Sequence, residues 1–298
     1  MVFSDVALAR RLEAAEGFAC AQFAEARRRL FPECESTWTK RAGTTLVFDG
    51  IDAPTTQSFG LGLFEELTAG DLHEMEEFFR SRGAAVMHEV SPMAGAAALD
   101  LLCARNYRPF EVSSVLYRTV EAPSEGLPAG IRVRTVGPEE TQIWSSVSTR
   151  GWSHGHPELA EFLEQTGALC MAREQSPCFL AELEGEPGAA GGPGAAGVLS
   201  LHQGVALFGG SATVPELRRR GLQAALLDER MRYAAEQGCD LAMMVAEAGS
   251  RVARDRAMER VRPAGDLSFM GDSAEHLARG RRGLSSGEAA GGKRTIRS

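Results

Sequence analysis

The stretch between residues 204 and 248 constrains the fold of this 298-residue chain more than any other part. It opens with an apolar run at residues 205–208, passes through two glycines and stops at Pro215. Apolar residues then recur at helical spacing as far as Gly238, which is typical of the residue that follows a helix. A second apolar run, residues 241–246, predicts a buried strand. The order of strand, glycine-bearing turn, helix and strand predicts a βαβ unit.

The turn between the first strand and the helix has the composition of an anion-binding site. The first amide hydrogens of a helix have no intrahelical partners, and the helix dipole adds partial positive charge there. Gly221 would let a diphosphate approach this backbone closely, and Arg218, Arg219 and Arg220 add full positive charge. The P-loop pattern GxxxxGK(S/T) and the dinucleotide pattern GxGxxG are both absent. The turn therefore predicts a diphosphate site of another type.

The stretch V-P-x-x-R-R-R-G-L-Q-A-A-L resembles the acetyl-CoA-binding segment of the GNAT acyltransferases, whose pattern is (R/Q)-x-x-G-x-(G/A). Arg218 takes the first position and Gly221 the glycine, whereas Gln223 stands where Gly or Ala is usual. That position mainly offers its backbone to the phosphates, so a Gln side chain that points outward can be accommodated. An ordinary amphipathic helix with a solvated arginine face is the alternative. The resemblance implies an acetyl-CoA site formed by Ala212, Thr213, Val214, Arg218, Arg219, Arg220, Gly221, Leu222, Gln223 and Ala224.

Composition narrows the class of protein. Hydrophobic residues make up 44% of the chain and charged residues 24%, as in globular proteins with substantial cores, and the length suits two domains. No stretch approaches the length of a membrane span, and the N-terminus lacks a basic-then-apolar signal, so we expect a cytoplasmic protein without a membrane partner. The six cysteines form no CxxC pair and no Cys/His ligand spacing, so we expect free thiols and no metal.

Charge is unevenly distributed along the chain. The formal net charge is -8, which argues against a general nucleic-acid-binding surface. Residues 279–298 carry six basic side chains against one acid, Glu288, and we expect them to form a disordered basic tail. The acidic remainder favours a cationic or amine acceptor through electrostatic steering.

The first half of the chain predicts alternating strands and helices. Residues 3–30 read as two helices separated near Gly17. This half, residues 1–120, resembles a second GNAT copy, but no RxxG turn follows Leu63, so the resemblance implies a degenerate copy without a coenzyme site. An unrelated α+β domain is the alternative. The pattern predicts strands at 44–48, 56–63, 85–90 and 111–120 and helices at 71–82 and 94–105.

A segment rich in proline and glycine, residues 121–130, is the predicted linker. The GNAT domain with the acetyl-CoA site follows at residues 131–278. Residues 185–195 are of low complexity and predict a long mobile hairpin loop. The predicted fold class is α+β in a three-layer arrangement: two tandem GNAT-like domains with a mixed, mostly antiparallel sheet flanked by helices. Strands at 131–136, 177–183 and 197–202, and helices from Pro138 and Pro157, precede the βαβ unit.

The resemblance implies direct acyl transfer from a thioester to an amine, with a backbone N–H near residues 212–214 that polarises the carbonyl oxygen. A base must also remove a proton from the amine. The candidate bases are Glu182 and His202 on strands next to the βαβ unit, and His154, His156 or Glu158 in the loop that follows Trp152. Each has an alternative interpretation: the carboxylate is a solvated strand residue, and the histidines are ordinary loop residues.

The sequence after residue 250 departs from the family pattern. Many GNATs place a tyrosine there as general acid, and no tyrosine follows in this chain. Only residues 267–270 form an apolar run, so two closing strands are not expected and the strand at 241–246 would keep an unpaired edge. Three explanations remain open: divergence, completion of the sheet by the N-terminal half or a partner chain, or a shifted reading frame near residues 250–263.

Taken together, these patterns predict an acetyl-CoA-dependent N-acetyltransferase that acts on a small amine or peptide amine. Nucleic acid is not expected as a partner, although tail-mediated binding forms a third class that salt dependence would reveal. Self-association as a homodimer stays open. Because the tyrosine is missing, a catalytically inactive acyl-CoA-binding or scaffold protein is the main alternative.

Overall fold

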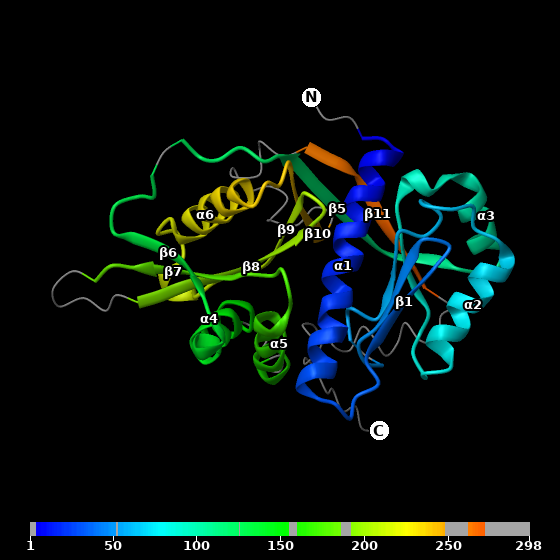
Figure 1. Ribbon diagram of the computed structural model, residues 1–298, viewed down its shortest axis with the longest axis horizontal. Coiled ribbons are helices and arrows are strands. Elements are labelled where there is room, and N and C mark those ends of the chain that lie inside the picture. The colour runs from blue at the N-terminus through cyan, green and yellow to red at the C-terminus, as the bar shows by residue number, and fades with distance from the viewer. Residues whose placement is uncertain are drawn as a thin grey trace, which may run out of the picture.

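The computed structural model describes residues 4–51, 53–124, 126–154, 160–185, 192–247 and 262–271. Its described strands form one mixed sheet in the order β1-β2-β3-β4-β11-β5-β10-β9-β8-β7-β6 (Figure 1). The first-half strands are β1 Thr37–Arg41, β2 Thr44–Phe48, β3 Gln57–Phe59, β4 Met87–Val90 and β5 Arg108–Thr119. The second-half strands are β6 Ile131–Val136, β7 Cys178–Leu183, β8 Gly192–His202, β9 Val205–Thr213, β10 Leu241–Glu247 and β11 Arg262–Gly271.

Helices cover both faces of this sheet. In the first half, α2 and α3 share one core with β2 and β4, while α1 packs on the opposite face of β2 and β3. In the second half, α6 shares a core with alternate residues of β7, β8 and β9, and α4 lies on their other face. The three-layer α+β fold class is therefore confirmed. The helices are α1 Val6–Leu30, α2 Ala69–Arg80, α3 Gly95–Ala104, α4 Thr141–Trp152, α5 Ala160–Ala172 and α6 Leu222–Glu236.

The two halves repeat one plan. Each contains a parallel strand pair joined by a helix, β3-α2-β4 in the first half and β9-α6-β10 in the second. The other described pairings are antiparallel. The predicted βαβ unit is therefore confirmed, with Gly238 in the left-handed region (φ 75°) just after α6.

The last strand of each half completes the sheet of the other half. β5 pairs with β10 from Thr119↔Leu241 to Ser113↔Glu247, and β11 lies between β4 and β5. The expected unpaired edge at residues 241–246 is therefore wrong, and the N-terminal half supplies the missing neighbour. No pair of closing strands was predicted after residue 250, and the described residues contain one strand there, β11. The residues of β11 have a weak strand pattern. Pairing with β4 and β5 on both edges stabilises the strand in spite of this.

Helix α1 is a single 25-residue helix, not the two predicted helices. The expected break at Gly17 does not occur because this glycine lies where the helix meets β2 and β3. A Cβ at Gly17 would approach the Cβ atoms of Thr45 and Phe59 to 3.1 and 3.2 Å. The glycine therefore permits close packing instead of ending the helix. Asp5 caps the helix, accepting from the Leu8 amide at 2.7 Å.

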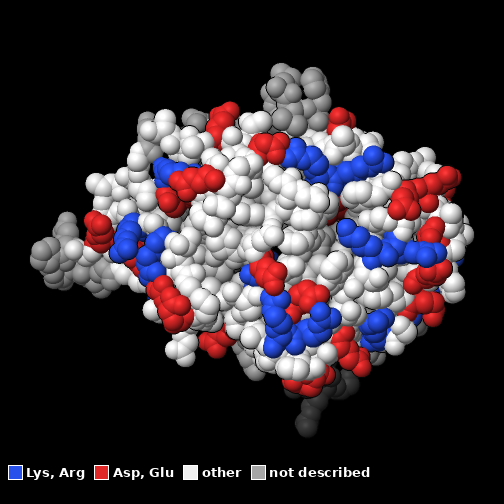
Figure 2. All heavy atoms as spheres, in the orientation of Figure 1, with Lys and Arg blue, Asp and Glu red and all other residues white. Residues whose placement is uncertain are grey.

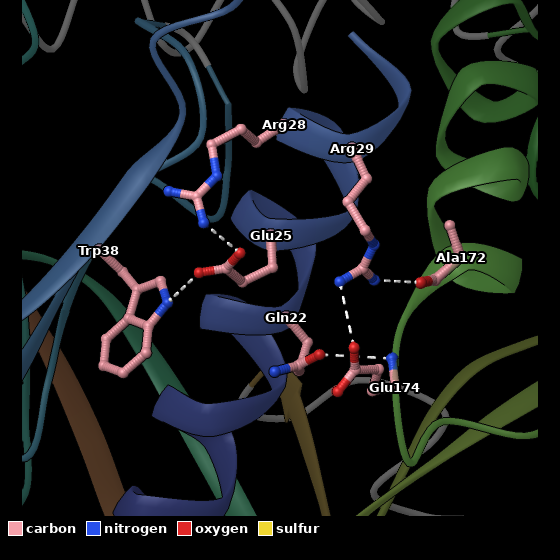
Figure 3. A network of polar contacts seen from close by, with 7 residues as sticks. All are labelled: Gln22, Glu25, Arg28, Arg29, Trp38, Ala172 and Glu174. Atoms are coloured by element: carbon pink, nitrogen blue, oxygen red, sulfur yellow. Dashed lines mark hydrogen bonds and ion pairs between the residues drawn. The ribbon is translucent and has the colours of Figure 1, made fainter. Parts of the chain in front are cut away.

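The same helix joins the two halves. Its N-terminal Leu8 and Leu12 pack against β5, β9 and β10. At its C-terminal end, Arg29 forms an ion pair with Glu174 at 3.3 Å and donates to the carbonyl of Ala172, the last residue of α5 (Figure 3). The Gln22 side chain accepts from the Glu174 amide at 3.3 Å. These contacts fix the second half against a helix that belongs to the first.

Several local expectations need correction. β1 was not predicted, and the strand expected at 56–63 is reduced to β3, after which Gly60 and Gly62 turn the chain with positive φ. The loop expected at 185–195 is shorter on its C-terminal side because β8 begins at Gly192; residues 186–191 and the tail 279–298 lie outside the described residues. The six cysteines are free, as predicted. Within the described ranges, no helix is both long and apolar enough to cross a bilayer.

Candidate acyl-coenzyme A site

The RRRG turn forms an uncapped helix start. β9 ends at Thr213, a 3-10 turn spans Pro215–Leu217, and α6 begins at Leu222. Arg219 and Gly221 both adopt left-handed backbone, with φ values of 62° and 85°. Gly221 is the N-cap residue, and no side chain caps the first turn of α6. The first amides of this helix therefore have no side-chain acceptor at the N-cap.

The three arginines differ in what they contact. Arg218 donates to the carbonyls of Thr213 at 3.2 Å and Gly151 at 3.1 Å, so it ties the turn to the ends of β9 and α4. Arg219 and Arg220 are exposed and have no ion pair within the described part of the chain. Arg218 therefore shapes the turn, whereas the other two present their charge to solvent.

Gln223 occupies the position at which the sequence departs from the GNAT pattern. Its side chain is exposed, and its Oε1 accepts from Thr213 Oγ1 at 3.3 Å. Leu222 beside it is buried in the α6 core, while Ala224 is exposed. The Gln223 side chain thus bridges the first turn of α6 and the end of β9.

Strands β9 and β10 separate just before this turn. They pair at three positions, from Val205↔Leu241 to Leu207↔Met243, after which β10 continues only with β5. β9 stays paired with β8 as far as Thr213, through a bulge at Gly210 and Ser211. Beyond Leu207, one edge of β9 therefore faces a gap in the parallel pair.

The amides of β9 divide between its two edges. The Val214 amide donates to the Gly194 carbonyl at 2.9 Å, toward β8. Because alternate residues of a strand direct their N–H groups to opposite edges, the Thr213 N–H faces the separated β10. Gly151 of α4 lies against this position, and a Cβ there would approach the Thr213 nitrogen to 3.0 Å. Of residues 212–214, Thr213 is therefore the one whose amide points into the gap.

The predicted loop candidates lie at the same place. Gly151, near the end of α4, touches Ala212 and Thr213, so Trp152 and His154 follow within three residues of the gap. Both side chains are exposed. His156 and Glu158 lie outside the described residues. The described part of the chain holds no group of three or more side chains suited to a metal ion.

Glu182 and His202 lie elsewhere. Glu182 on β7 forms an ion pair with Arg134 at 2.9 Å, and Arg134 is held in turn by Glu140 at 2.6 Å. His202 lies in the β8–β9 hairpin, where its ring stacks on Phe18 of α1 with a centroid distance of 4.3 Å. Burial, together with the Lys40 charge, lowers the pKa of His202. The hairpin is about 25 Å along β9 from the RRRG turn. The structure therefore does not bring these two residues together with His154.

The first half closes the corresponding turn. Helix α2 carries a full capping box, in which Thr68 Oγ1 accepts from the Asp71 amide and the Asp71 carboxylate accepts from the Thr68 amide, both at 3.1 Å. The Phe64 ring covers the turn, since a Cβ on Gly60 would approach it to 2.5 Å. The Glu13 carboxylate of α1 accepts from the Gly60 amide at 2.8 Å. Side chains of the protein itself thus occupy the groups that are open in the second half.

Two sets of buried polar groups were not predicted from the sequence. Glu13 and Glu16 of α1 lie close to Glu89 of β4, and burial raises the pKa of Glu13 to about 8 and of Glu16 to about 7. Arg230 of α6 is fully buried, and burial lowers its pKa to about 9. Its signal was available in the sequence, because Arg230 lies four residues after Leu226 on the apolar face of the predicted helix.

The surface around these elements is mixed in charge. On the face shown in Figure 2, acidic and basic side chains are interspersed, without a continuous basic region among the described residues.

A parallel strand pair that separates in front of an uncapped, arginine-rich helix start defines a protein of the acyl-CoA N-acyltransferase fold. Neither the known family models nor the curated proteins include a match to the sequence. Solved structures do match. A GCN5-related N-acetyltransferase from Kribbella flavida is 16% identical, with a TM-score of 0.58 over 87% of this chain and 97% of its own.

Two further structures have the same architecture. A tandem GNAT protein from the clavulanic acid biosynthesis pathway is 14% identical (TM-score 0.52, 78% of this chain and 79% of its own). The C-terminal domain of a putative lysylphosphatidylglycerol synthetase from Agrobacterium fabrum is 12% identical (TM-score 0.51, 93% and 96%). The chain therefore has the fold of the GCN5-related N-acetyltransferases, in a two-domain α/β arrangement.

Proposed function

We propose that this protein is an acetyl-CoA-dependent N-acetyltransferase that transfers the acetyl group directly to a small amine or a peptide amine. The observation that carries the proposal is the RRRG turn, where left-handed Arg219 and Gly221 precede a helix without a side-chain cap. The first half, which shares the plan, lacks these features. We therefore propose one coenzyme site per chain.

The residues of the turn fit a coenzyme diphosphate. Gly221 has no side chain to obstruct the amides of Leu222, Gln223 and Ala224, and Arg219 and Arg220 supply positive charge. The gap between β9 and β10 would take the acyl arm, with the Thr213 amide directed at the thioester carbonyl. Bound acetyl-CoA supplies an activated acyl group.

The acceptor would enter beside the end of α4. Gly151, exposed Trp152 and exposed His154 lie next to the Thr213 amide. Of the candidate bases that the structure describes, Glu182, His202 and His154, only His154 lies within reach of this region. We therefore propose it as the base that takes the proton of the amine. The cytoplasm, which supplies acetyl-CoA, is the proposed compartment.

Coenzyme binding is tested by thermal denaturation with acetyl-CoA. A hundredfold excess over the dissociation constant should raise Tm by about 5 °C. Arg220→Glu and Gly221→Asp should abolish the shift, because both place negative charge at the diphosphate. Arg28→Glu on α1 is the control, since it reverses an exposed charge far from the turn. No shift for the unmodified protein would refute the site.

Turnover is tested by following CoA release with a panel of amines and peptides. Release that depends on the amine, and that disappears in Arg220→Glu, would establish the transferase. His154→Gln should lower the rate at saturating acetyl-CoA without changing coenzyme affinity. Tight coenzyme binding without release for any acceptor would instead establish the inactive coenzyme-binding protein.

A further inference from the structure

Arg230 is a charged side chain buried without a carboxylate. It lies in α6 with no exposed surface, and in the described residues its partners are three carbonyls, one hydroxyl and the ring of Phe208. Placing a charge in a protein interior is costly, and a shared hydrogen bond to a carbonyl compensates less than an ion pair does. A buried arginine of this kind therefore calls for a reason beyond core packing.

The contacts of Arg230 converge on the bulge of β9. Its Nη1 donates to the carbonyls of Val198 at 3.1 Å and Gly209 at 3.2 Å, and its Nη2 donates to Ser211 Oγ at 2.8 Å. Gly209 and Ser211 flank Gly210, which has a φ of 57°. The guanidinium thus holds the strand on both sides of the residue at which the ladder with β8 loses its register.

The guanidinium is tightly packed against β8 and β9. A Cβ on Gly197 would approach Nη1 to 3.0 Å, and a Cβ on Gly210 would approach the Val198 side chain to 3.1 Å. The planar fork of arginine can reach two strands at once, whereas an ammonium presents a single point. The side chain therefore acts as a rigid brace between α6, β8 and β9.

The position of the bulge determines where the following amides point. β9 loses its pairing with β10 after Leu207, and the bulge begins three residues later at Gly210. The Thr213 amide, two residues beyond Ser211, faces the gap. The Gly209 carbonyl accepts from Arg230, and in a planar trans peptide the N–H of the next residue points the opposite way. The Gly210 N–H is thus directed away from the guanidinium and is polarised by it.

We propose that Arg230 is a positioning residue for the thioester: it fixes the bulge of β9 so that the backbone amides beyond it meet the thioester carbonyl. This inference rests on the proposed function, because it assigns a role within the same acyl-coenzyme A site. Arg230 does not touch the coenzyme in this arrangement and acts through Gly209 and Ser211.

The test compares acetyl-CoA with free CoA, which lacks the carbonyl. A hydrogen bond from the strand to the carbonyl should make the unmodified protein bind acetyl-CoA about tenfold more tightly than CoA. Arg230→Met should remove this preference while changing CoA affinity less than about threefold, because the RRRG turn is untouched. Arg230→Lys should restore only part of it. Arg232→Met, which alters the same helix at a partly exposed site, should keep the preference.

Hydrogen exchange gives a readout without ligand. In Arg230→Met, amides of residues 208–213 should exchange at least about tenfold faster, while those of β7 should not change. If Arg230→Met does not fold, Ser211→Ala removes one contact and should reduce the preference about threefold. A preference retained in the folded variants, or absent from the unmodified protein, overturns the role of Arg230 and leaves the coenzyme site standing. Failure to bind any CoA overturns both.

Discussion

Helices α2 and α6 start at equivalent places in the two halves and present opposite surfaces. α2 satisfies its own first turn through Thr68 and Asp71, and Arg41 pairs with that carboxylate at 2.8 Å. Its contact with Thr68 lowers the pKa of Asp71, so negative charge remains at the helix start. α6 begins with Gly221, no cap and exposed arginines. One fold therefore yields a closed helix start that serves stability and an open one suited to an anion.

The strands before the two helices show the same contrast. In the first half, the Glu13 carboxylate bonds the Gly60 amide and α1 fills the space beyond β3. In the second half, the Thr213 amide faces a gap, and Gly151 approaches it without a side chain. Small changes in side chains thus separate a filled site from an open one, and substitutions that exchange these features test the comparison.

The largest effect on coenzyme binding is expected when the N3 residue of α6 is replaced by aspartate, the residue that α2 has at this position. Ala224 is at the N3 position of α6, as Asp71 is in α2. Ala224→Asp should weaken acetyl-CoA binding about 100-fold through repulsion of the diphosphate, yet leave Tm unchanged or slightly raised, because a carboxylate suits a helix start. Titration calorimetry and thermal denaturation measure the two effects, with Ala224→Asn as the uncharged control. Unchanged affinity in Ala224→Asp would place the phosphates elsewhere.

The carboxylates that fill the first half should make stability depend on pH. The folded-state pKa values of Glu13 and Glu16, about 8 and about 7, lie above those of the unfolded chain, so the folded state holds more protons in between. The free energy of unfolding should therefore fall as pH rises from about 5 to about 8, by up to about 1.4 kcal/mol per pH unit for each group.

Glu13→Gln should make the free energy of unfolding less dependent on pH, because glutamine still accepts from the Gly60 amide but does not titrate. Urea denaturation at pH 5, 6, 7 and 8 measures the free energy of unfolding, with exposed Glu66→Gln as the control. A free energy of unfolding that stays level or rises over this range would show that the buried cluster is ionised in the folded state.

A smaller effect is expected from covering the open amide. Gly151→Ala would bring a Cβ to within 2.7 Å of the Ala212 Cβ and 3.0 Å of the Thr213 nitrogen. Acetyl-CoA affinity and turnover should fall about tenfold, a loss of about 1.4 kcal/mol, while free CoA affinity changes little. Gly167→Ala is not a useful control because it clashes with Ser145, so Gly126→Ala, which meets nothing within 4 Å, serves instead. Equal losses for both ligands would indicate a disturbed fold.

The smallest effect should come from opening α2. Thr68→Ala removes its cap and should lower stability by about 1 kcal/mol, seen as a fall in Tm of about 2 °C. Acetyl-CoA affinity should not change, since the proposed coenzyme site lies in the other half. Calorimetric scanning and a binding titration on one preparation measure both. If the Thr68→Ala variant binds a second molecule of acetyl-CoA, Glu13 and Phe64 do not block the turn in the first half.

Elements with strong local patterns were predictable. β2, β6, α2 and α6 follow directly from β-branched runs, a capping residue and helical spacing, and the RRRG turn from its position between strand and helix. Features set by tertiary contact were not. Gly17 reads as a helix break until Thr45 and Phe59 are seen against it, and β11 has no pattern apart from residues 267–270.

The geometry of the candidate site was predictable to the same extent. The RRRG turn is a local signal, whereas a base depends on which distant residues the fold brings together. Glu182 and His202 were plausible as residues on neighbouring strands, but an ion pair with Arg134 and a stack on Phe18 engage them away from the gap. The role of Arg230 depends on carbonyl groups, which leave no trace in a sequence.

The position of β11 between strands of the first half limits how far the protein can fold during its synthesis. β11 follows the other described strands in the chain, yet it lies in the sheet between β4 and β5 of the first half. The ribosome therefore releases β4 and β5 long before their shared neighbour exists, so the edges that face it stay open. The pairing of these two strands is completed only after residues 262–271 have been synthesised.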